Sequence, residues 1–483
     1  MLPGHSPPGA NVDAVAELHD LTALEQGSAV RRGEVSALEL TEHYLDRVAR
    51  LDDVGAFVEV VADRARAAAR AVDPAAPGAG PLHGVPTAVK DLNLTAGVPT
   101  RFGSAAFDDH VPEVSDAVTE AVEAAGMPWL GKTSTPELGS PCYTEPEGRP
   151  AAVTPWDRTR MAGGSSGGAG AAVAAGLVPL AQGSDGGGSI RIPASCCGLV
   201  GLKPTRGRIS GHPMYGDPTG LATSGSLART VRDAAALLDV LAGRRPGDPS
   251  WAPEPSTSFL AACDTAPRRL RVARFSTPVI ADVEVDPAVL ATYDDASRLL
   301  SDLGHEVEDV PVPLPPEAVP VFERCWAVLT ALSPVPEDRQ HLLRPLTRWL
   351  MDQGHAVTGP EFGTAIGAMR RFAAAALTAL APYDVVLTPT LATPPLPVGA
   401  IRDDADPARD FAAQKAFTPY TSAWNVTGMP AVSLPLGETV VDGTTLPVGV
   451  MLAGRPAEET LLLSVAAQVE AARPWHDRRP PGW

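Results

Sequence analysis

The chain has 483 residues, of which 44% are hydrophobic and 20% are charged, and its formal net charge is −18. This composition is typical of a globular protein and excludes a disordered or fibrous chain. The acidic surface field repels phosphate backbones, which excludes nucleic acid as the main ligand and favours an uncharged or cationic small substrate.

The N-terminal segment and the cysteines indicate the compartment. Residues 1–10 are rich in proline and glycine and lack the basic and apolar segments of a signal peptide. No later segment reaches the length of a membrane span. Five cysteines occur without the spacing of a zinc site, and in a reducing compartment they are expected to be free thiols. We therefore expect a cytoplasmic protein with no membrane partner and no metal.

Helices are predicted at the start of the chain. The apolar spacing predicts helical structure over residues 13–51 and a second helix over residues 61–72. Residues 83–90 have the pattern of a short buried strand that ends at Lys90. A helix over residues 116–125 and a strand over residues 127–132 follow, and a helix of small residues then runs from the glycine-rich loop at 163–168 to about residue 175.

The second half of the chain continues the alternation. Strands are predicted over residues 270–275, 305–310, 384–387, 431–436 and 448–452, and a closing helix over residues 457–471. This alternation favours an α/β fold with a mixed sheet. Length alone favours roughly two to three domains. Because no repeat or low-complexity linker divides the chain, we expect one domain over residues 1–483.

A helical pattern with several aromatic residues covers residues 311–380. The aromatic residues are Phe322, Trp326 and Trp349. Two interpretations are open: the segment caps a binding site, or it is a plain helical layer packed on the core.

Two glycine-rich loops each present a serine. Gly-Gly-Ser-Ser-Gly-Gly over residues 163–168 contains Ser165, and residues 183–193 contain Ser189. Glycine lets the backbone turn sharply and lets amide N–H groups converge without side chains in the way. The three glycines before Ser189 are therefore candidate donors of an oxyanion hole: Gly186, Gly187 and Gly188.

A serine nucleophile needs a base, and the loops have no accompanying His/Asp pair. Only four lysines occur in the chain, and the other 39 − 4 = 35 basic residues are arginines. Unlike arginine, lysine can lose a proton near neutral pH. Lys90, at the end of an apolar strand, is placed for desolvation to lower its pKa. Asp91 would oppose that shift, but neighbouring strand residues face opposite sides, so we expect Asp91 to be structural.

Three segments of the chain resemble the amidase signature family. They are Gly-Val-Pro-Thr-Ala-Val-Lys-Asp over residues 84–91, the loop at 163–168, and the serine loop at 183–193 with its continuation through residues 198–205. The spacings also agree with the family, since 165 − 90 = 75 and 189 − 165 = 24. Clear similarity covers about residues 82–207, and weaker similarity reaches residues 384–389 and 425–431.

The resemblance implies a fold, a triad and a mechanism. The implied fold is a central twisted mixed β-sheet covered by α-helices on both faces. Ser189 is the implied nucleophile, and Ser165, which follows a cis peptide bond in the family, relays protons between Ser189 and Lys90. The implied reaction is hydrolysis of an amide through an acyl-enzyme, with no cofactor.

The serine loop also indicates a branch of the family. Ser-Asp-Gly-Gly-Gly-Ser over residues 184–189 departs from the commoner Thr-Asp-Thr-Gly-Gly-Ser and resembles the branch with 6-aminohexanoate cyclic-dimer hydrolases. We expect a small or linear carboxamide as substrate, with 6-aminohexanoate-type cyclic or linear amides among the candidates. Ser140, Cys142 and Cys325 are expected either to border the pocket or simply to pack.

Other functions stay open at this point. One alternative is the glutaminase subunit of a tRNA-dependent amidotransferase, against which the acidic charge and the serine loop argue. Another is a binding protein without catalytic activity. A homodimer is the oligomeric state to test.

Two further motifs match letter patterns of other protein classes. Residues 126–133 fit a phosphate-binding loop, but a helix precedes them and bulky residues fill the loop, so we predict a buried strand there. Residues 164–168 fit the nucleophile elbow of α/β hydrolases with Ser166 as nucleophile. That interpretation needs a downstream Asp and His and leaves Lys90 and Ser189 unexplained.

Overall fold

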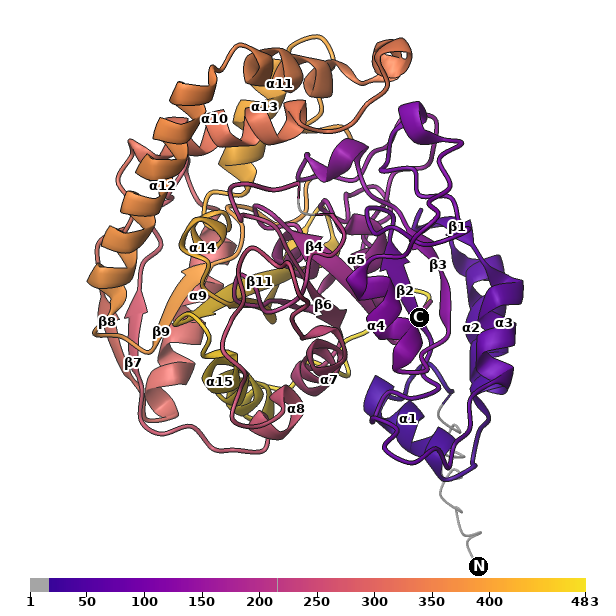
Figure 1. Ribbon diagram of the computed structural model, residues 1–483. Coiled ribbons are helices and arrows are strands. Elements are labelled where there is room, and N and C mark those ends of the chain that lie inside the picture. Colours follow the sequence, from indigo (N-terminus) through magenta and orange to yellow (C-terminus); the bar gives the residue numbers. More distant parts are fainter. Residues whose placement is uncertain (1–16, 215) are drawn as a thin grey trace, which may run out of the picture.

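A large mixed sheet forms the centre of the molecule. The computed structural model describes residues 17–214 and 216–483 of the chain. It confirms the predicted α/β architecture, with helices on both faces of the sheet (Figure 1). In spatial order the eight strands are β4 (Leu180–Asp185), β6 (Thr223–Ala228), β5 (Val200–Lys203), β10 (Ala431–Val441), β11 (Thr444–Gly454), β9 (Val385–Pro389), β7 (Arg271–Arg274) and β8 (Glu306–Asp309).

The sheet joins segments that are far apart in the sequence. Its antiparallel part runs from β4 to β9, and β9, β7 and β8 are parallel to one another. Ala431 of β10 pairs with Lys203 of β5, and Val385 of β9 pairs with both Gly454 of β11 and Val272 of β7. Segments spread from residue 180 to residue 454 therefore share one sheet.

Side-chain alternation on β11 explains the helices on both faces. Successive strand residues point to opposite sides. Val450 and Leu452 pack in a cluster with α7 (Val231–Leu241) and α15 (Glu459–Ala472). Met451 and Ala453 pack in another cluster with α12 (Gly359–Leu380) and α14 (Ala423–Thr427). Each face of this strand is buried by its own helices.

The structure differs from the single central sheet of the prediction in one respect. The predicted strand that ends at Lys90 is β2 (Thr87–Lys90), and it belongs to a separate three-stranded sheet with β3 (Trp129–Thr133) and β1 (Phe57–Val60). Side chains connect β2 to β4 of the large sheet. Thr87 Oγ1 donates to the carbonyl of Leu180 over 3.2 Å, and the Lys90 amide donates to Gln182 Oε1 over 3.0 Å. These bonds hold Lys90 beside the end of β4.

Two helices occupy the predicted N-terminal helical region. They are α1 (Ala23–Arg31) and α2 (Ala37–Leu51), and residues 13–16 of the prediction lie outside the described residues. Ser36 and Glu39 form a capping box at the start of α2, which explains why a new helix begins there. The helix expected over residues 61–72 is α3 (Ala62–Arg70).

Residues 311–380 are helical, as their pattern predicts. They contain α10 (Ala318–Ala331), a 3-10 helix at Glu337–Leu342, α11 (Pro345–His355) and α12. In Figure 1 α10, α11 and α12 form the orange upper-left part of the molecule. Every helix in the described part of the chain is too short or too polar to cross a lipid bilayer.

Candidate active site

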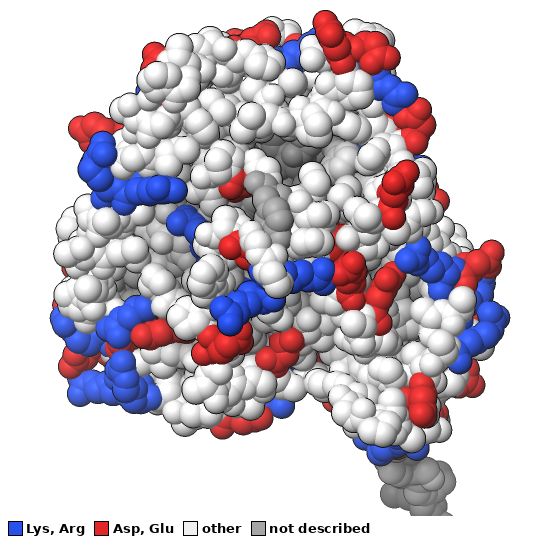
Figure 2. Space-filling view, viewed as in Figure 1, with Lys and Arg blue, Asp and Glu red and all other residues white. Residues whose placement is uncertain are grey.

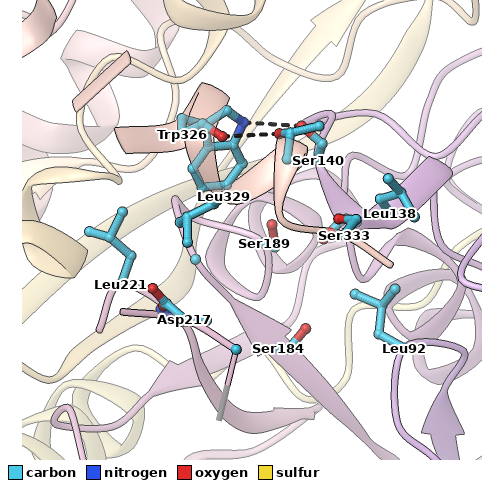
Figure 3. A pocket seen from close by; sticks show the side chains of 16 residues that line it. Leu92, Leu138, Ser140, Ser184, Ser189, Asp217, Leu221, Trp326, Leu329 and Ser333 are labelled. Atoms are coloured by element: carbon cyan, nitrogen blue, oxygen red, sulfur yellow. Dashed lines mark hydrogen bonds between the residues drawn. The ribbon is translucent and has the colours of Figure 1, made fainter. Parts of the chain in front are cut away.

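A pocket of about 230 Å³ lies where the glycine-rich loops meet the helical region. The surface is hollowed below the upper helices in the view of Figure 2, and mostly uncharged atoms surround the hollow. Ser165, Ser184 and Ser189 lie on its wall, together with Trp326 and Leu329 of α10. Figure 3 shows Ser189 near the middle of the pocket, between α10 and Leu92.

Lys90 lies behind this wall, out of contact with water. Its side chain is 0% exposed, and Nζ is 2.8 Å from Ser165 Oγ and 3.0 Å from Ser184 Oγ. Burial lowers the pKa of the Lys90 ammonium to about 7, against the opposing effect of Asp185. This amine therefore loses its proton more easily than an exposed lysine does, and Ser165 Oγ is its nearest hydrogen-bond partner.

The loop that carries Ser165 is tightly packed. The Gly164–Ser165 peptide bond is cis, as the resemblance implies. A Cβ on Gly164 would lie 2.8 Å from the Tyr143 amide nitrogen, closer than real Cβ atoms come, so only glycine fits there. Directly after Ser166 the chain enters α5 (Gly167–Ala174), a fully buried helix of small residues. The loop thus presents Ser165 from a closely packed backbone.

A buried ion pair shapes the loop that carries Ser189. The Asp185 carboxylate, at the end of β4, binds the Arg191 guanidinium through Nε at 2.9 Å and Nη2 at 2.8 Å. Asn425 Nδ2 also donates to Asp185 Oδ1 over 2.9 Å. Although burial acts to raise the pKa of Asp185, Arg191 and these hydrogen bonds hold it well below its usual range. The carboxylate stays charged and fixes both ends of the loop.

This carboxylate corrects one part of the predicted oxyanion hole. The Gly188 amide donates to Asp185 Oδ1 over 2.8 Å, so it is not available to a substrate. Within residues 17–214 and 216–483, the amides of Gly186 and Gly187 have no hydrogen-bond partner. The amide of Ser189, which sequence analysis did not consider, has none there either. Three amides thus remain as candidate donors, from Gly186, Gly187 and Ser189.

The two proposed catalytic serines line the same pocket. Ser165 is 2% exposed and Ser189 is 7% exposed. The loops are joined next to them, because the Ser166 amide donates to the Ser189 carbonyl over 3.0 Å. In the described structure no hydrogen bond links the two serine hydroxyls, whereas Lys90 and Ser165 are in contact. The structure therefore brings Lys90, Ser165 and Ser189 to one site. Among these described residues, Lys90 is hydrogen-bonded to Ser165, and the hydroxyls of Ser165 and Ser189 are not hydrogen-bonded to each other.

Sequence analysis missed Ser184. Its hydroxyl contacts Lys90 Nζ, and its side chain lies on the pocket wall (Figure 3). The available signal was its position at the end of the strand before Asp185. That position alone does not show which way the hydroxyl points, because β2 approaches β4 only in the folded chain.

Helix α10 forms the other side of the pocket. Trp326 Nε1 donates to Ser140 Oγ over 3.0 Å (Figure 3). The Trp326 ring also stacks on Phe322 with ring centroids 5.5 Å apart. A Cβ added to Gly186 would lie 3.5 Å from the Trp326 ring. The indole therefore covers the serine loop and occupies the space next to Gly186.

Of the three predicted pocket residues, the structure places one on the wall. Ser140 lines the pocket. Cys142 and Cys325 are buried and are not among the described residues that line it. Cys142 packs beside α5 and Cys325 packs beside α12, in separate apolar clusters, which is the simple packing that was the other interpretation.

The two misleading motifs have structural explanations. Residues 126–133 contain β3, which is fully buried, as predicted. Ser166 is 0% exposed, and its hydroxyl donates to the Ser184 carbonyl over 3.1 Å and accepts from the Ser184 amide over 3.2 Å. Ser166 therefore ties the two loops together and does not face the pocket.

Burial alone does not identify the base. Burial also lowers the pKa of Lys132 to about 8 and that of Lys203 to about 7. Lys132 donates to Thr95 and Thr100 beside Asp91, and Lys203 donates to the Pro204 carbonyl. Neither lysine lines the pocket, and only Lys90 contacts a pocket serine.

One group of the described residues brings metal-ligating atoms together away from the pocket: Glu17, His19 and His43. His19 Nε2 is 2.9 Å from Arg47 Nη1, and His19 Nδ1 is 3.2 Å from His43 Nε2. Since arginine only donates, Nε2 accepts and Nδ1 carries the hydrogen that it donates to His43. Both nitrogens of His19 are thus used in hydrogen bonds, so the group does not fit a metal.

Comparisons with known proteins agree with this site. The sequence pattern of the amidase family matches residues 39–463. The chain is 37% identical over 459 residues to a putative amidase of Synechocystis sp., covering 93% of this chain and 88% of that protein. It is 36% identical over 490 residues to the 6-aminohexanoate-cyclic-dimer hydrolase of Paenarthrobacter ureafaciens, covering 95% and 96%.

The chain is also similar to the solved structure of a hydrolase. The structure of a 6-aminohexanoate cyclic dimer hydrolase complexed with substrate superimposes with a TM-score of 0.87 at 33% identity, covering 96% of this chain and 99% of that one. The family match over most of the chain, the close fold and the named relatives lead to one conclusion. The chain belongs to the amidase signature family and is an amidase, a hydrolase of carbon–nitrogen bonds other than peptide bonds.

Proposed function

We propose that this amidase hydrolyses a small or linear carboxamide through a triad of Lys90, Ser165 and Ser189 and an acyl-enzyme on Ser189. The observation that carries the proposal is the 2.8 Å contact between the wholly buried Lys90 amine and Ser165 Oγ, next to the pocket that holds Ser189. A neutral amine in this position accepts a proton from Ser165, and Ser165 in turn takes the proton of Ser189.

The proposed reaction has two halves. Ser189 Oγ attacks the amide carbonyl carbon, and its proton moves through Ser165 to Lys90. The amides of Gly186, Gly187 and Ser189 stabilise the oxyanion of the tetrahedral intermediate. The C–N bond then breaks, and the leaving amine takes the proton back from Lys90 through Ser165. A water molecule cleaves the acyl-enzyme by the same proton route and frees the carboxylic acid.

The relatives support a narrower substrate proposal. A relative at 36% identity and a solved structure at 33% identity are each named as a 6-aminohexanoate cyclic dimer hydrolase. The pocket walls here are largely apolar, which suits a methylene chain on the acyl side. We propose 6-aminohexanoate-type cyclic or linear amides as the first substrates to assay.

The test combines an activity assay with detection of the acyl-enzyme. Purified protein is incubated with 6-aminohexanoate amides, and amine release is compared among the wild type, Ser189→Ala, Lys90→Met and the control Ser224→Ala. We expect the first two variants to lose at least about a thousandfold in kcat and the control to retain activity. Quenched wild-type samples should carry the acyl mass on the peptide that contains Ser189. Full activity of Ser189→Ala would contradict the proposal.

A second candidate function has support from one relative. The chain is 34% identical over 495 residues to the A subunit of the glutamyl-tRNA(Gln) amidotransferase of Thioalkalivibrio sulfidiphilus, covering 96% of this chain and 100% of that protein. The assay above separates the two functions, because a free-standing amidase works without partner subunits. Glutamine hydrolysis that requires other proteins of such a complex would favour the second function. The homodimer and the cytoplasmic location stay predictions.

A further inference from the structure

The pocket contains one carboxylate in mostly apolar walls. Among its described lining residues, Asp217 is the only charged side chain. The apolar lining includes Leu92, Leu138, Leu221 and Leu329. Figure 3 places Asp217 on the same side of the pocket as Leu221, across from Leu92 and Leu138. A charged group in such surroundings needs an explanation, because burying a carboxylate costs free energy unless a partner compensates.

The local hydrogen bonds of Asp217 do not use its full capacity. Oδ1 accepts from the amides of Thr219 at 2.8 Å and Gly220 at 3.0 Å. Oδ2 accepts only from the amide of Ala222, at 3.0 Å, among the described residues. A carboxylate oxygen accepts two hydrogen bonds, so Oδ2 has room for another donor. The loop thus fixes the carboxylate and leaves one oxygen partly free.

No cation in the described part of the chain makes a direct contact with this carboxylate. Within residues 17–214 and 216–483, Asp217 forms no ion pair. Arg206 is close enough to interact with it electrostatically. Its guanidinium, however, donates to the backbone carbonyls of Gly220, Asn425 and Val426. The carboxylate of Asp217 is therefore half-buried and held by backbone amides, and Arg206 interacts with it electrostatically without forming a direct ion pair.

The neighbouring pocket adds to the negative field. It shares Asp217, Ser184 and two apolar residues with the first pocket, and it also contains Asp116 and Asp248. Its only described lysine or arginine is Arg206. The face in Figure 2 is consistent with this, because acidic atoms lie closer to the hollow than basic ones do. Both pockets therefore favour a cation over an anion.

We propose that Asp217 is a specificity-determining residue that binds the protonated amine of an amino-functionalised amide, so that the enzyme prefers ω-amino acyl amides to neutral or anionic ones. The proposal rests on the proposed function, since it concerns the acyl side of the same site. The methylene chain packs on the leucines, and the terminal ammonium donates to Asp217 Oδ2. An acyl chain that ends in a carboxylate meets the like charge of Asp217.

The test uses three amides of matched length and measures kcat/KM for each. They are 6-aminohexanamide, which is cationic, heptanamide, which is neutral, and adipamic acid, which is anionic. We expect the wild type to prefer the cation to the neutral amide and the neutral amide to the anion. Asp217→Asn should lower the cation-to-neutral ratio about five- to tenfold. A ratio is used because loss of folded protein lowers both rates equally.

The matched control is Asp239→Asn, which removes the same charge from a carboxylate that lines neither pocket and accepts the amides of Phe259 and Leu260. Its ratio should equal that of the wild type. If Asp217→Asn does not fold, Asp217→Glu should keep the preference, and added salt should reduce it in the wild type. A wild type without preference for the cation, or an unchanged ratio in Asp217→Asn, would overturn the proposal. Either result leaves the triad untouched, because the triad fails only if Ser189→Ala stays active.

Discussion

At the scale of single residues, the site depends on an amine that the fold keeps from water. Three buried lysines have a lowered pKa, and only Lys90 contacts a pocket serine. In the proposed mechanism, position decides which of these lysines is the base. Lys90 receives its position from β2, which side chains hold against β4.

Ser184→Ala tests the second contact of that amine. The Ser184 hydroxyl accepts from Lys90 Nζ over 3.0 Å, and an acceptor stabilises the ammonium more than the neutral amine. Its removal should move the pKa of Lys90 further down and shift the rising limb of the pH–rate profile to lower pH. We expect kcat to fall about tenfold, because the amine loses one of its three hydrogen-bond acceptors. Ser224→Ala is the control, and an identical profile in Ser184→Ala would contradict this role.

The sequence predicted some site residues and missed others for a physical reason. Lys90, Ser165 and Ser189 lie in segments whose residue types indicate their chemistry. Ser184 was missed and Gly188 was wrongly included as a donor, because their roles depend on contacts with Lys90 and Asp185. Such hydrogen-bond partners depend on how loops and strands approach one another in the folded chain. The spacing of residues along the sequence does not specify this.

At the scale of elements, the turn from β4 into α6 (Arg191–Cys197) is built around the Asp185–Arg191 pair. Both side chains are 0% exposed, and the Asp185 carboxylate also holds the amides of Gly188 and Ile190. The loop that carries the proposed nucleophile Ser189 is thus fixed by a carboxylate that water does not reach. Its stabilisation is present at neutral pH and is lost as the pH falls through the depressed pKa of Asp185.

Asp185→Ala should therefore destabilise the whole protein. It leaves Arg191 buried without its partner, which costs about 3–5 kcal/mol of the free energy of unfolding. Urea unfolding followed by circular dichroism measures the change. Glu34→Ala is the matched control, since it breaks an Arg–carboxylate pair at the surface with Arg32. A midpoint for Asp185→Ala equal to that of the control would show that the loop does not need the pair.

Trp326→Ala tests the role of α10 as the roof of the pocket. Removing the indole opens space above Gly186 and breaks the bond to Ser140. We expect KM for slender amides to rise about tenfold and branched acyl amides to become better substrates. Ser140→Ala removes only the hydrogen bond and should have a smaller effect. Unchanged KM values and unchanged acyl preference in Trp326→Ala would mean that α10 is a plain helical layer.

At the scale of the whole molecule, the large sheet joins strands that lie between residues 180 and 454. The strands predicted from apolar runs are present, but their order could not be predicted, because partners such as Ala431 and Lys203 lie far apart in the sequence. For the same reason the sequence did not show that β2 belongs to a second sheet. Helix starts were more predictable, since a capping box such as Ser36 and Glu39 is local.

The shared sheet predicts cooperative unfolding of the entire chain. The large sheet joins strands between residues 180 and 454, and the N-terminal sheet is tied to it by hydrogen bonds between β2 and β4, so neither part is expected to unfold alone. Calorimetry should give a single transition with a calorimetric enthalpy about equal to the van't Hoff enthalpy. Two resolved transitions would contradict the expected single domain over residues 1–483.

The pH dependence of kcat/KM tests the central claim, that a neutral Lys90 drives the proton relay. The amine must be uncharged to accept a proton, and its folded pKa of about 7 lies below the ordinary value of 10.5. The rate should therefore be low in acid, rise with pH through an apparent pKa of about 7, and reach a plateau above it. A profile that is flat across neutral pH, or one that rises only near pH 10, would contradict the account.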